Sequence, residues 1–137
     1  MHAMKKLSSL LLLTASLAGC RHEADLPSPA NLLGTWRLTD RQCYCAVAPV
    51  PDETITFEAS QRFQLFRNGK LAAEGSYALS RSPACGETIA RDQLRLATTA
   101  GVAVPTGAYT VQNQTLVIDQ TNQCVSDGPV YTYTRQP

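Results

Sequence analysis

The sequence predicts an all-β fold, a small eight-stranded antiparallel up-and-down barrel. From residue 32 onward, eight short segments alternate apolar and polar side chains with the period of two that marks half-buried strands. Turn signals separate neighbouring segments, and no window shows the 3.6-residue period of an amphipathic helix. A meander of eight such strands can close on itself, which removes the exposed edges of an open sheet.

The first strand is predicted within residues 32–45. Trp36 and Leu38 alternate there with polar neighbours, and the strand ends before Pro49, because proline cannot donate to a strand ladder. Asp40 lies in phase with Trp36 and Leu38. It is therefore either an acid inside the barrel or a solvated residue at its rim, and its place near the strand end favours the rim.

The second strand is predicted at residues 53–59. Ile55, Phe57 and Ala59 are expected to face the core, whereas Glu53 falls with the outward-facing polar side chains. The remaining strands are predicted at residues 62–67, 70–80, 93–98, 107–112, 115–119 and 130–135.

One turn, one glycine and one loop support this division of the chain. Asn68-Gly69 is a strong hairpin signal, because both residues tolerate the positive φ of a type I′ turn. Gly75 lies in mid-strand and predicts a bend or a close backbone contact. Residues 80–92 are expected to be irregular.

The inner face of the predicted strands is rich in aromatic side chains. We favour a packed core; the alternative is a pocket wall whose tyrosine hydroxyls orient a small apolar ligand. The ligand-lining candidates are Trp36, Phe57, Phe63, Tyr77, Tyr109, Tyr131 and Tyr133. The other residues expected to face inward are Leu38, Ile55, Leu65, Leu71, Leu79, Leu94, Leu96, Val111, Leu116 and Ile118.

The N-terminus predicts an export signal and a lipid anchor. Lys5-Lys6 precede an apolar run at residues 7–17, which is shorter than the ~20 residues of a transmembrane helix and typical of a signal peptide. Leu17-Ala18-Gly19-Cys20 then resembles the lipobox of bacterial lipoproteins. This resemblance implies that residues 1–19 are removed and that Cys20 carries a diacyl thioether and an acylated amine, with palmitate-type chains. The alternative is an ordinary secretory peptide that is cut elsewhere.

The residues after the lipobox suggest where the protein resides. Arg21, rather than an aspartate, follows Cys20, and the resemblance then implies the outer membrane, on either its periplasmic or its outer face. Residues 20–31 contain Pro27 and few apolar side chains, so we expect a flexible tether before a barrel domain at residues 32–137.

Charge argues against a nucleic-acid partner. Without Lys5 and Lys6, ten Lys and Arg residues stand against eleven Asp and Glu residues, a net charge of −1. No basic stretch interleaves with aromatic residues. We expect a monomer that reaches the membrane through its lipid.

Four cysteines remain in the mature chain, and in an exported domain an even count predicts disulfides. A zinc site is disfavoured because the only histidine there is His22. On an extended strand, Cys43 and Cys45 would have Cα atoms ~6.6 Å apart, at the edge of disulfide geometry. We therefore favour pairing each of them with Cys85 or Cys124, and keep Cys43–Cys45 with Cys85–Cys124 as the alternative.

No catalytic arrangement is recognised in the sequence. Without a histidine in the domain, Ser-His-Asp and Cys-His sites are ruled out, and we expect neither an enzyme, a cofactor nor a metal. An enzyme that uses a carboxylate is a weaker alternative. The arginines that fall out of phase with the core are interpreted as solvated exterior rather than as a carboxylate clamp: Arg37, Arg41, Arg62, Arg67, Arg91 and Arg95.

Gly34-Thr35-Trp36 at the start of the first strand and Arg135 in the last resemble the lipocalin-like (calycin) barrels. In that superfamily the tryptophan closes one end of the barrel, and a basic residue of the last strand packs across it. The resemblance therefore implies structural roles for Gly34, Trp36 and Arg135, including a cation–π contact. The domain is shorter than a full lipocalin, and no helix follows its last strand.

More narrowly, the chain resembles small lipocalin-like lipoproteins of environmental bacteria. The shared features are Gly75-Ser76-Tyr77 and an ending with Cys124, Asp127-Gly128-Pro129, Tyr131, Tyr133 and Arg135. These observations lead to two hypotheses. The first is an outer-membrane lipoprotein that binds a small hydrophobic molecule without catalysis. The second is an envelope module that binds a protein, for example as a hydrolase inhibitor, through the loops 46–52, 80–92 or 121–129.

Overall fold

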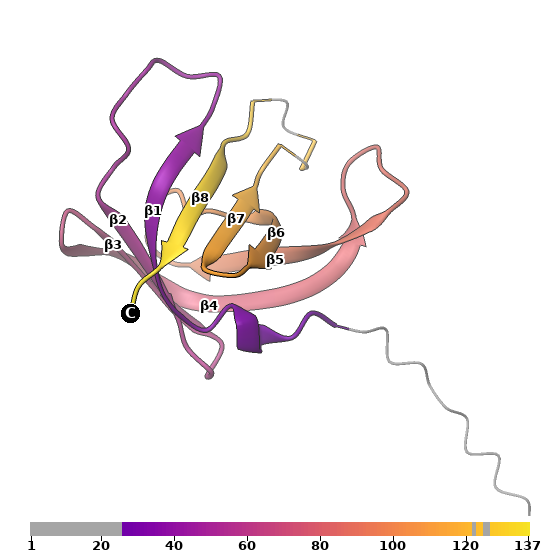
Figure 1. Ribbon diagram of the computed structural model, residues 1–137, viewed down its shortest axis with the longest axis horizontal. Coiled ribbons are helices and arrows are strands. Elements are labelled where there is room, and N and C mark those ends of the chain that lie inside the picture. The colour runs from indigo at the N-terminus through magenta and orange to yellow at the C-terminus, as the bar shows by residue number, and fades with distance from the viewer. Residues whose placement is uncertain (1–25, 122, 125–126) are drawn as a thin grey trace, which may run out of the picture.

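Eight antiparallel strands form a closed barrel in the computed structural model, which describes residues 26–121, 123–124 and 127–137 (Figure 1). Each strand pairs with the next, and β1 pairs with β8, so the predicted up-and-down barrel is confirmed. The elements are η1 (Pro29–Asn31), β1 (Gly34–Gln42), β2 (Glu53–Phe57), β3 (Arg62–Arg67), β4 (Lys70–Pro83), β5 (Ala90–Thr98), β6 (Gly107–Gln112), β7 (Thr115–Asp119) and β8 (Val130–Arg135).

Strands β3, β6, β7 and β8 have the predicted bounds, but the segment expected to be irregular, residues 80–92, is mostly strand. The β4–β5 ladder continues from Ser80↔Gln93 to Pro83↔Ala90. This extension is a two-stranded ribbon with mostly exposed side chains on both faces, so its sequence shows no alternation. The β2 strand also ends earlier than predicted, and Ala59 is exposed in the turn that follows.

Side chains from all eight strands, together with Leu32, form one core inside the barrel. Two register shifts change which residues face it. In β3–β4 the pairing moves from Leu65↔Ala73 to Phe66↔Leu71, and Leu71 is 49% exposed, so its predicted inward position is wrong. In β1 a shift after Leu38 leaves Asp40 exposed at the rim, as favoured. A β-bulge explains both, because one extra residue reverses the faces beyond it.

One end of the barrel is closed by Trp36 and Arg135. The guanidinium of Arg135 lies 4.1 Å from the centre of the Trp36 ring, which confirms the expected cation–π contact. It also donates hydrogen bonds to the backbone carbonyls of Leu33 and Asn31, and the Trp36 indole donates to the Leu32 carbonyl at 2.8 Å. The short η1 helix is therefore held against this end, although it lies in the segment expected to be a tether.

Two glycines allow close approach of other groups. At Gly34, φ is +115°, and a Cβ would lie 3.0 Å from Arg135 Nη1. At Gly75, a Cβ would lie only 1.9 Å from the carbonyl oxygen of Ala97, so the predicted close backbone contact is confirmed.

The pairing of β5 with β6 is the shortest in the barrel. It consists of Gln93↔Ala108 and Leu94↔Gly107 only. Beyond it, the Leu96 backbone N–H donates to the Thr106 hydroxyl at 3.2 Å instead of to a neighbouring strand.

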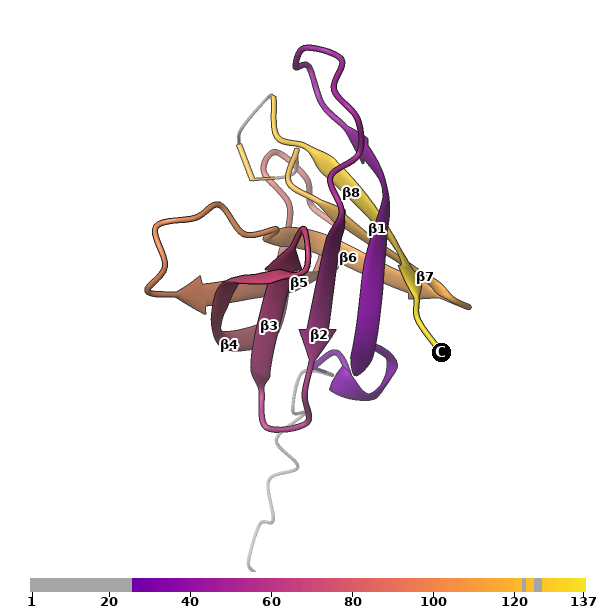
Figure 2. The same ribbon diagram turned by 90° about the vertical axis from the view of Figure 1, so that its left-hand side faces the viewer.

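Different segments of the chain lie at the two ends of the barrel. The β1–β2 loop (residues 43–52) projects from the end opposite η1 (Figure 2). Strands β3 and β8 bring Arg67 and Val130 to this loop end, since neighbouring strands run in opposite directions. No helix in the described ranges is long and apolar enough to cross a membrane.

Replacing Gly75 with alanine tests the close contact between β4 and β5. We expect Gly75→Ala to lower the free energy of unfolding by about 1–3 kcal/mol, because the added Cβ meets a backbone carbonyl that cannot rotate away. Urea denaturation measures the change. The neighbouring, exposed Ser76→Ala is the matched control and should stay within about 0.5 kcal/mol of wild type. Equal effects of the two variants would contradict the prediction.

Candidate functional site

The aromatic residues predicted to line a ligand pocket pack against one another. Six of the seven are buried and Tyr131 is half-buried. The Phe57 and Tyr77 rings meet edge to face at 5.3 Å, and the Tyr77 hydroxyl donates to the Glu58 carbonyl at 2.9 Å. The structure therefore brings these side chains together, and they contact one another and the neighbouring core residues.

Five hollows in the described part of the chain involve loop residues or a few neighbouring strands, and one core aromatic residue, Tyr109, lines two of them. One, of about 450 Å³, lies over β5, β6 and β7 and is lined in part by Ile89, Tyr109 and Val117. Arg81 and Asp92 form an ion pair of 3.5 Å at its side. None of the five is lined by the aromatic core as a set.

A buried carboxylate lies inside the barrel near the loop end. Glu53 is 2% exposed, and both of its oxygens are engaged. The Tyr133 hydroxyl donates to Oε1 at 2.6 Å, and Arg67 Nε donates to Oε2 at 2.7 Å. Arg67 also donates to the Ala103 carbonyl at 2.9 Å, which ties in the β5–β6 loop. In the described part of the chain, every buried side-chain nitrogen or oxygen has a hydrogen-bond partner.

The sequence interpretation had placed Glu53 and Arg67 on the exterior, and both assignments are wrong. Glu53 lies two residues before Ile55 and four before Phe57, so the strand period itself puts it on the inner face. The strand period alone predicts an inner side chain at Glu53, whereas the usual preference of charged side chains for water predicts an outer one. The ion pair with Arg67, whose side chain is 34% exposed, compensates the buried charge of Glu53 and makes the inner position tolerable.

The Glu53 network links three strands through one buried carboxylate. Burial and the neighbouring Glu53 carboxylate raise the pKa of Tyr133 far above its ordinary value of 10, so its hydroxyl stays protonated as a donor. No histidine is present in the domain. The network joins β2, β3 and β8 across the place where the barrel closes.

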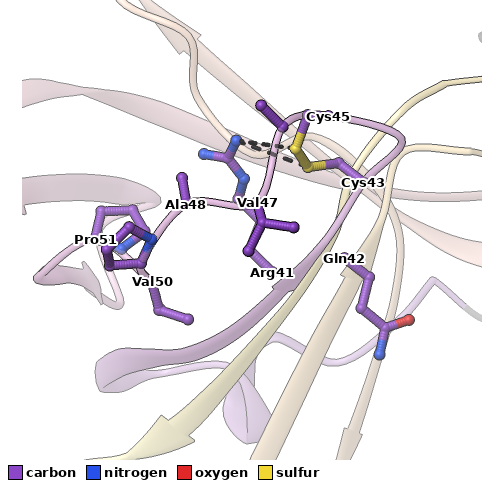
Figure 3. Close-up of a pocket in the computed structure, with 10 residues that line it drawn as sticks. Arg41, Gln42, Cys43, Cys45, Val47, Ala48, Val50 and Pro51 are labelled. Atoms are coloured by element: carbon purple, nitrogen blue, oxygen red, sulfur yellow. Dashed lines mark hydrogen bonds between the residues drawn. A yellow bond between two sulfur atoms is a disulfide. The ribbon is translucent and has the colours of Figure 1, made fainter.

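The β1–β2 loop exposes apolar side chains that a soluble domain would normally bury. Tyr44 is 91% exposed, Val47 is fully exposed and Val50 is 42% exposed. Together with Arg41 and both loop cysteines, this loop surrounds a hollow of about 330 Å³ (Figure 3). This loop therefore combines exposed apolar side chains with a concave site.

The far base of the loop is fixed at Asp52. Its carboxylate accepts from Arg37 at 3.2 Å, and its backbone carbonyl accepts from the Asn68 N–H at 2.8 Å. The loop thus returns to the barrel at a defined position beside the β3–β4 turn.

Cys43 is bonded to Cys45, and Cys85 to Cys124. The pairing favoured from the sequence is wrong, and the alternative pairing is the one observed. The strand geometry assumed for Cys43 and Cys45 does not apply, because β1 ends at Gln42 and the chain bends there, which brings the two Cα atoms to 5.2 Å.

The two disulfides differ in what they brace. Cys43–Cys45 has a sequence separation of 2, whereas Cys85–Cys124 has one of 39 and joins the β4–β5 loop to the β7–β8 loop. Chain-entropy arguments give about 1.6 kcal/mol for the short loop and about 4 kcal/mol for the long one. The stability of the barrel therefore depends little on Cys43–Cys45.

Other predicted site residues lie outside these clusters or outside the described ranges. Cys20 and the lipobox precede residue 26, where the description begins. The described residues contain no group of three or more His, Cys, Asp or Glu side chains placed to hold a metal ion. Comparisons with protein-family models, with curated proteins and with solved structures find no match to this chain.

Removing one hydroxyl tests the buried network. We expect Tyr133→Phe to lower the free energy of unfolding by about 1–3 kcal/mol, because it leaves a buried Glu53 oxygen without its donor. Thermal or urea unfolding measures the loss. Tyr131→Phe, on the same strand, removes a hydroxyl that forms no described hydrogen bond to Glu53, so it is the control and should cost clearly less. A Tyr133→Phe variant as stable as its control would show that the contact contributes nothing.

Alkaline pH tests the burial of Tyr109. Burial, with Asp92 and Tyr77 nearby, raises the pKa of Tyr109 to about 12. The unfolded chain loses this proton near pH ~10, so stability should fall as pH rises from about 10 towards 12. Urea denaturation between pH 9 and 11.5 measures the slope, which Tyr109→Phe should reduce. A slope in Tyr109→Phe equal to that of the wild type would contradict the assignment.

Proposed function

We propose that this protein is a lipid-anchored envelope lipoprotein whose barrel binds another protein through the β1–β2 loop, without catalysis. The observation that supports this proposal most strongly is the contrast between interior and rim. Inside the barrel, apolar side chains are buried in one cluster, whereas Tyr44, Val47 and Val50 are exposed on one loop.

The exposed side chains have the composition of a protein contact. Tyrosine is enriched at interfaces because its ring offers a large apolar area and its hydroxyl a polar contact. Burying apolar surface contributes roughly 25 cal/mol per Å², so a few such residues can dominate an affinity. Arg41 adds a cation to the lining of the hollow that the β1–β2 loop surrounds.

The loop is partly organised before it meets a partner. The Cys43–Cys45 bond constrains its start, and the contacts of Asp52 with Arg37 and Asn68 fix its end. A loop with fixed ends loses less conformational entropy on binding than a free one, which favours recognition.

The direction of the loop fits an anchored protein. The N-terminal segment reaches the barrel at the end held by η1, and the β1–β2 loop projects from the opposite end (Figure 2). A lipid on Cys20 would attach the chain on the side of the barrel opposite the loop, which leaves the loop accessible to a partner. The lipobox resemblance of Leu17-Ala18-Gly19-Cys20 and the proline-containing tether support this arrangement.

Carriage of a small hydrophobic molecule, the other hypothesis from the sequence, stays a prediction. The contacts among Trp36, Phe57, Tyr77 and Tyr133 favour a filled barrel of the lipocalin-like kind over a carrier. Native mass spectrometry of the protein extracted from its own membrane separates the two. A co-purifying apolar molecule would contradict our proposal, and a bound protein would support it.

Two loop substitutions test the docking surface. We expect Tyr44→Ser combined with Val47→Ser to weaken partner binding at least about ten-fold, because exposed apolar anchors are lost without a change in charge. Binding is measured with the partner found in the native complex, and circular dichroism checks the fold. Ile89→Ser, which alters an exposed apolar residue on the β4–β5 loop, is the matched control. Equal binding by the double variant and the control would contradict the proposed surface.

A further inference from the structure

The Cys43–Cys45 disulfide is an accessible pair of sulfur atoms inside the hollow of the β1–β2 loop. Cys45 is exposed and Cys43 is half-exposed, and both line the hollow of about 330 Å³ (Figure 3). Cys85–Cys124 joins residues separated by 39 in sequence, whereas Cys43–Cys45 joins residues separated by only 2. Its opening would release no strand of the barrel.

A cation lies beside both sulfur atoms. Arg41 Nη2 is 3.8 Å from Cys43 Sγ and 3.7 Å from Cys45 Sγ, as the dashed lines of Figure 3 show. Within the described part of the chain, Arg41 forms no ion pair with a carboxylate that would neutralise it. A guanidinium at this distance favours a thiolate over a thiol and therefore assists a sulfur that leaves with an electron pair.

From the exposed disulfide, the adjacent guanidinium and the hollow that surrounds them, we propose that Cys43–Cys45 is a thiol–disulfide exchange site. Its substrate class is a polypeptide with two accessible cysteine thiols. The inference does not rest on the proposed docking function, because exchange requires only a transient encounter at the sulfur atoms.

The exchange proceeds in two balanced steps. A substrate thiolate attacks the exposed Cys45 Sγ, the Cys43–Cys45 bond breaks, and Cys43 Sγ leaves as a thiolate beside Arg41. A second substrate thiolate then attacks the substrate sulfur of this mixed disulfide, which releases Cys45. Two substrate thiols have been oxidised to a disulfide, the protein disulfide has been reduced to two thiols, and the two protons pass to the protein or to water.

The other disulfide provides an internal control for reactivity. Cys85–Cys124 joins two loops over a separation of 39 residues, and no arginine hydrogen bond to its sulfurs accompanies it among the described contacts. Reduction at this site should therefore lag behind reduction at Cys43–Cys45.

The first experiment uses the folded, oxidised full chain and reduced glutathione. After quenching with N-ethylmaleimide, peptide mapping should show early loss of Cys43–Cys45 and a glutathione adduct on that pair, while Cys85–Cys124 and the circular dichroism spectrum stay intact. Equal reactivity of the two disulfides, or a Cys43 bonded elsewhere, would overturn the proposal.

The second experiment tests the role of Arg41. We expect Arg41→Gln to slow the reaction with glutathione about five-fold at low salt, since a charge at ~4 Å contributes a factor of this size even in water. High salt should reduce the difference. Arg62→Gln removes the same charge from β3 and should react within about two-fold of wild type. Equal rates for Arg41→Gln and Arg62→Gln would overturn the proposed assistance by Arg41.

A third measurement addresses substrate oxidation and separates this inference from docking. A synthetic peptide with two cysteines should become its disulfide, with one equivalent of Cys43–Cys45 reduced; no peptide oxidation would overturn the proposal. The Tyr44→Ser, Val47→Ser variant should keep its reaction with glutathione even if it loses the protein partner. Failure of docking and failure of exchange are therefore distinguishable.

Discussion

Pairing of β1 with β8 converts a meander into a closed barrel, and the other features depend on this closure. The pairing runs from Trp36↔Arg135 to Gln42↔Val130. At one end of it, the Arg135 guanidinium covers the Trp36 ring and holds the chain that precedes β1. Further along, Tyr133 of β8 bonds to the buried carboxylate of β2, which is paired with Arg67 of β3. Closure thus creates the apolar interior and brings the Tyr133 hydroxyl to the buried carboxylate, while the β1–β2 loop projects from the rim.

Local alternation was enough to predict all eight strands and most of the core, because each half-buried strand carries its own period. The errors have a different origin. Leu71 faces outward because of a register shift between two strands, which no single strand encodes. The β4–β5 extension to Pro83 was missed because a ribbon with two exposed faces has no period to detect. Both features arise from pairing, and pairing partners are distant in sequence.

The candidate site was less predictable than the fold. The aromatic set was located correctly inside the barrel, yet whether such residues line a cavity or fill it depends on the barrel's closure and on their rotamers. Glu53 could have been found from its phase with Ile55, but its partners lie on β3 and β8. The exposed apolar side chains of the β1–β2 loop follow no period, so the sequence indicates this loop only as one of three candidate binding loops. The bond between Cys43 and Cys45 required the bend that follows Gln42, which strand geometry alone does not supply.

The shortest strand pairing in the barrel is the one between β5 and β6, which consists of two residue pairs. We expect this pairing to be the point at which the barrel opens most easily. If these strands separated, the molecule would become an open sheet with two unpaired edges, the form of a β-protein most prone to join other chains. The Cys85–Cys124 disulfide links the loop before β5 to the loop after β7, and so connects the two sides of that junction by a covalent route outside the sheet. Even if the two residue pairs between β5 and β6 broke, the disulfide would keep the two strand edges close together. By limiting how far the two edges can separate, this disulfide would lower the chance that either edge pairs with another chain.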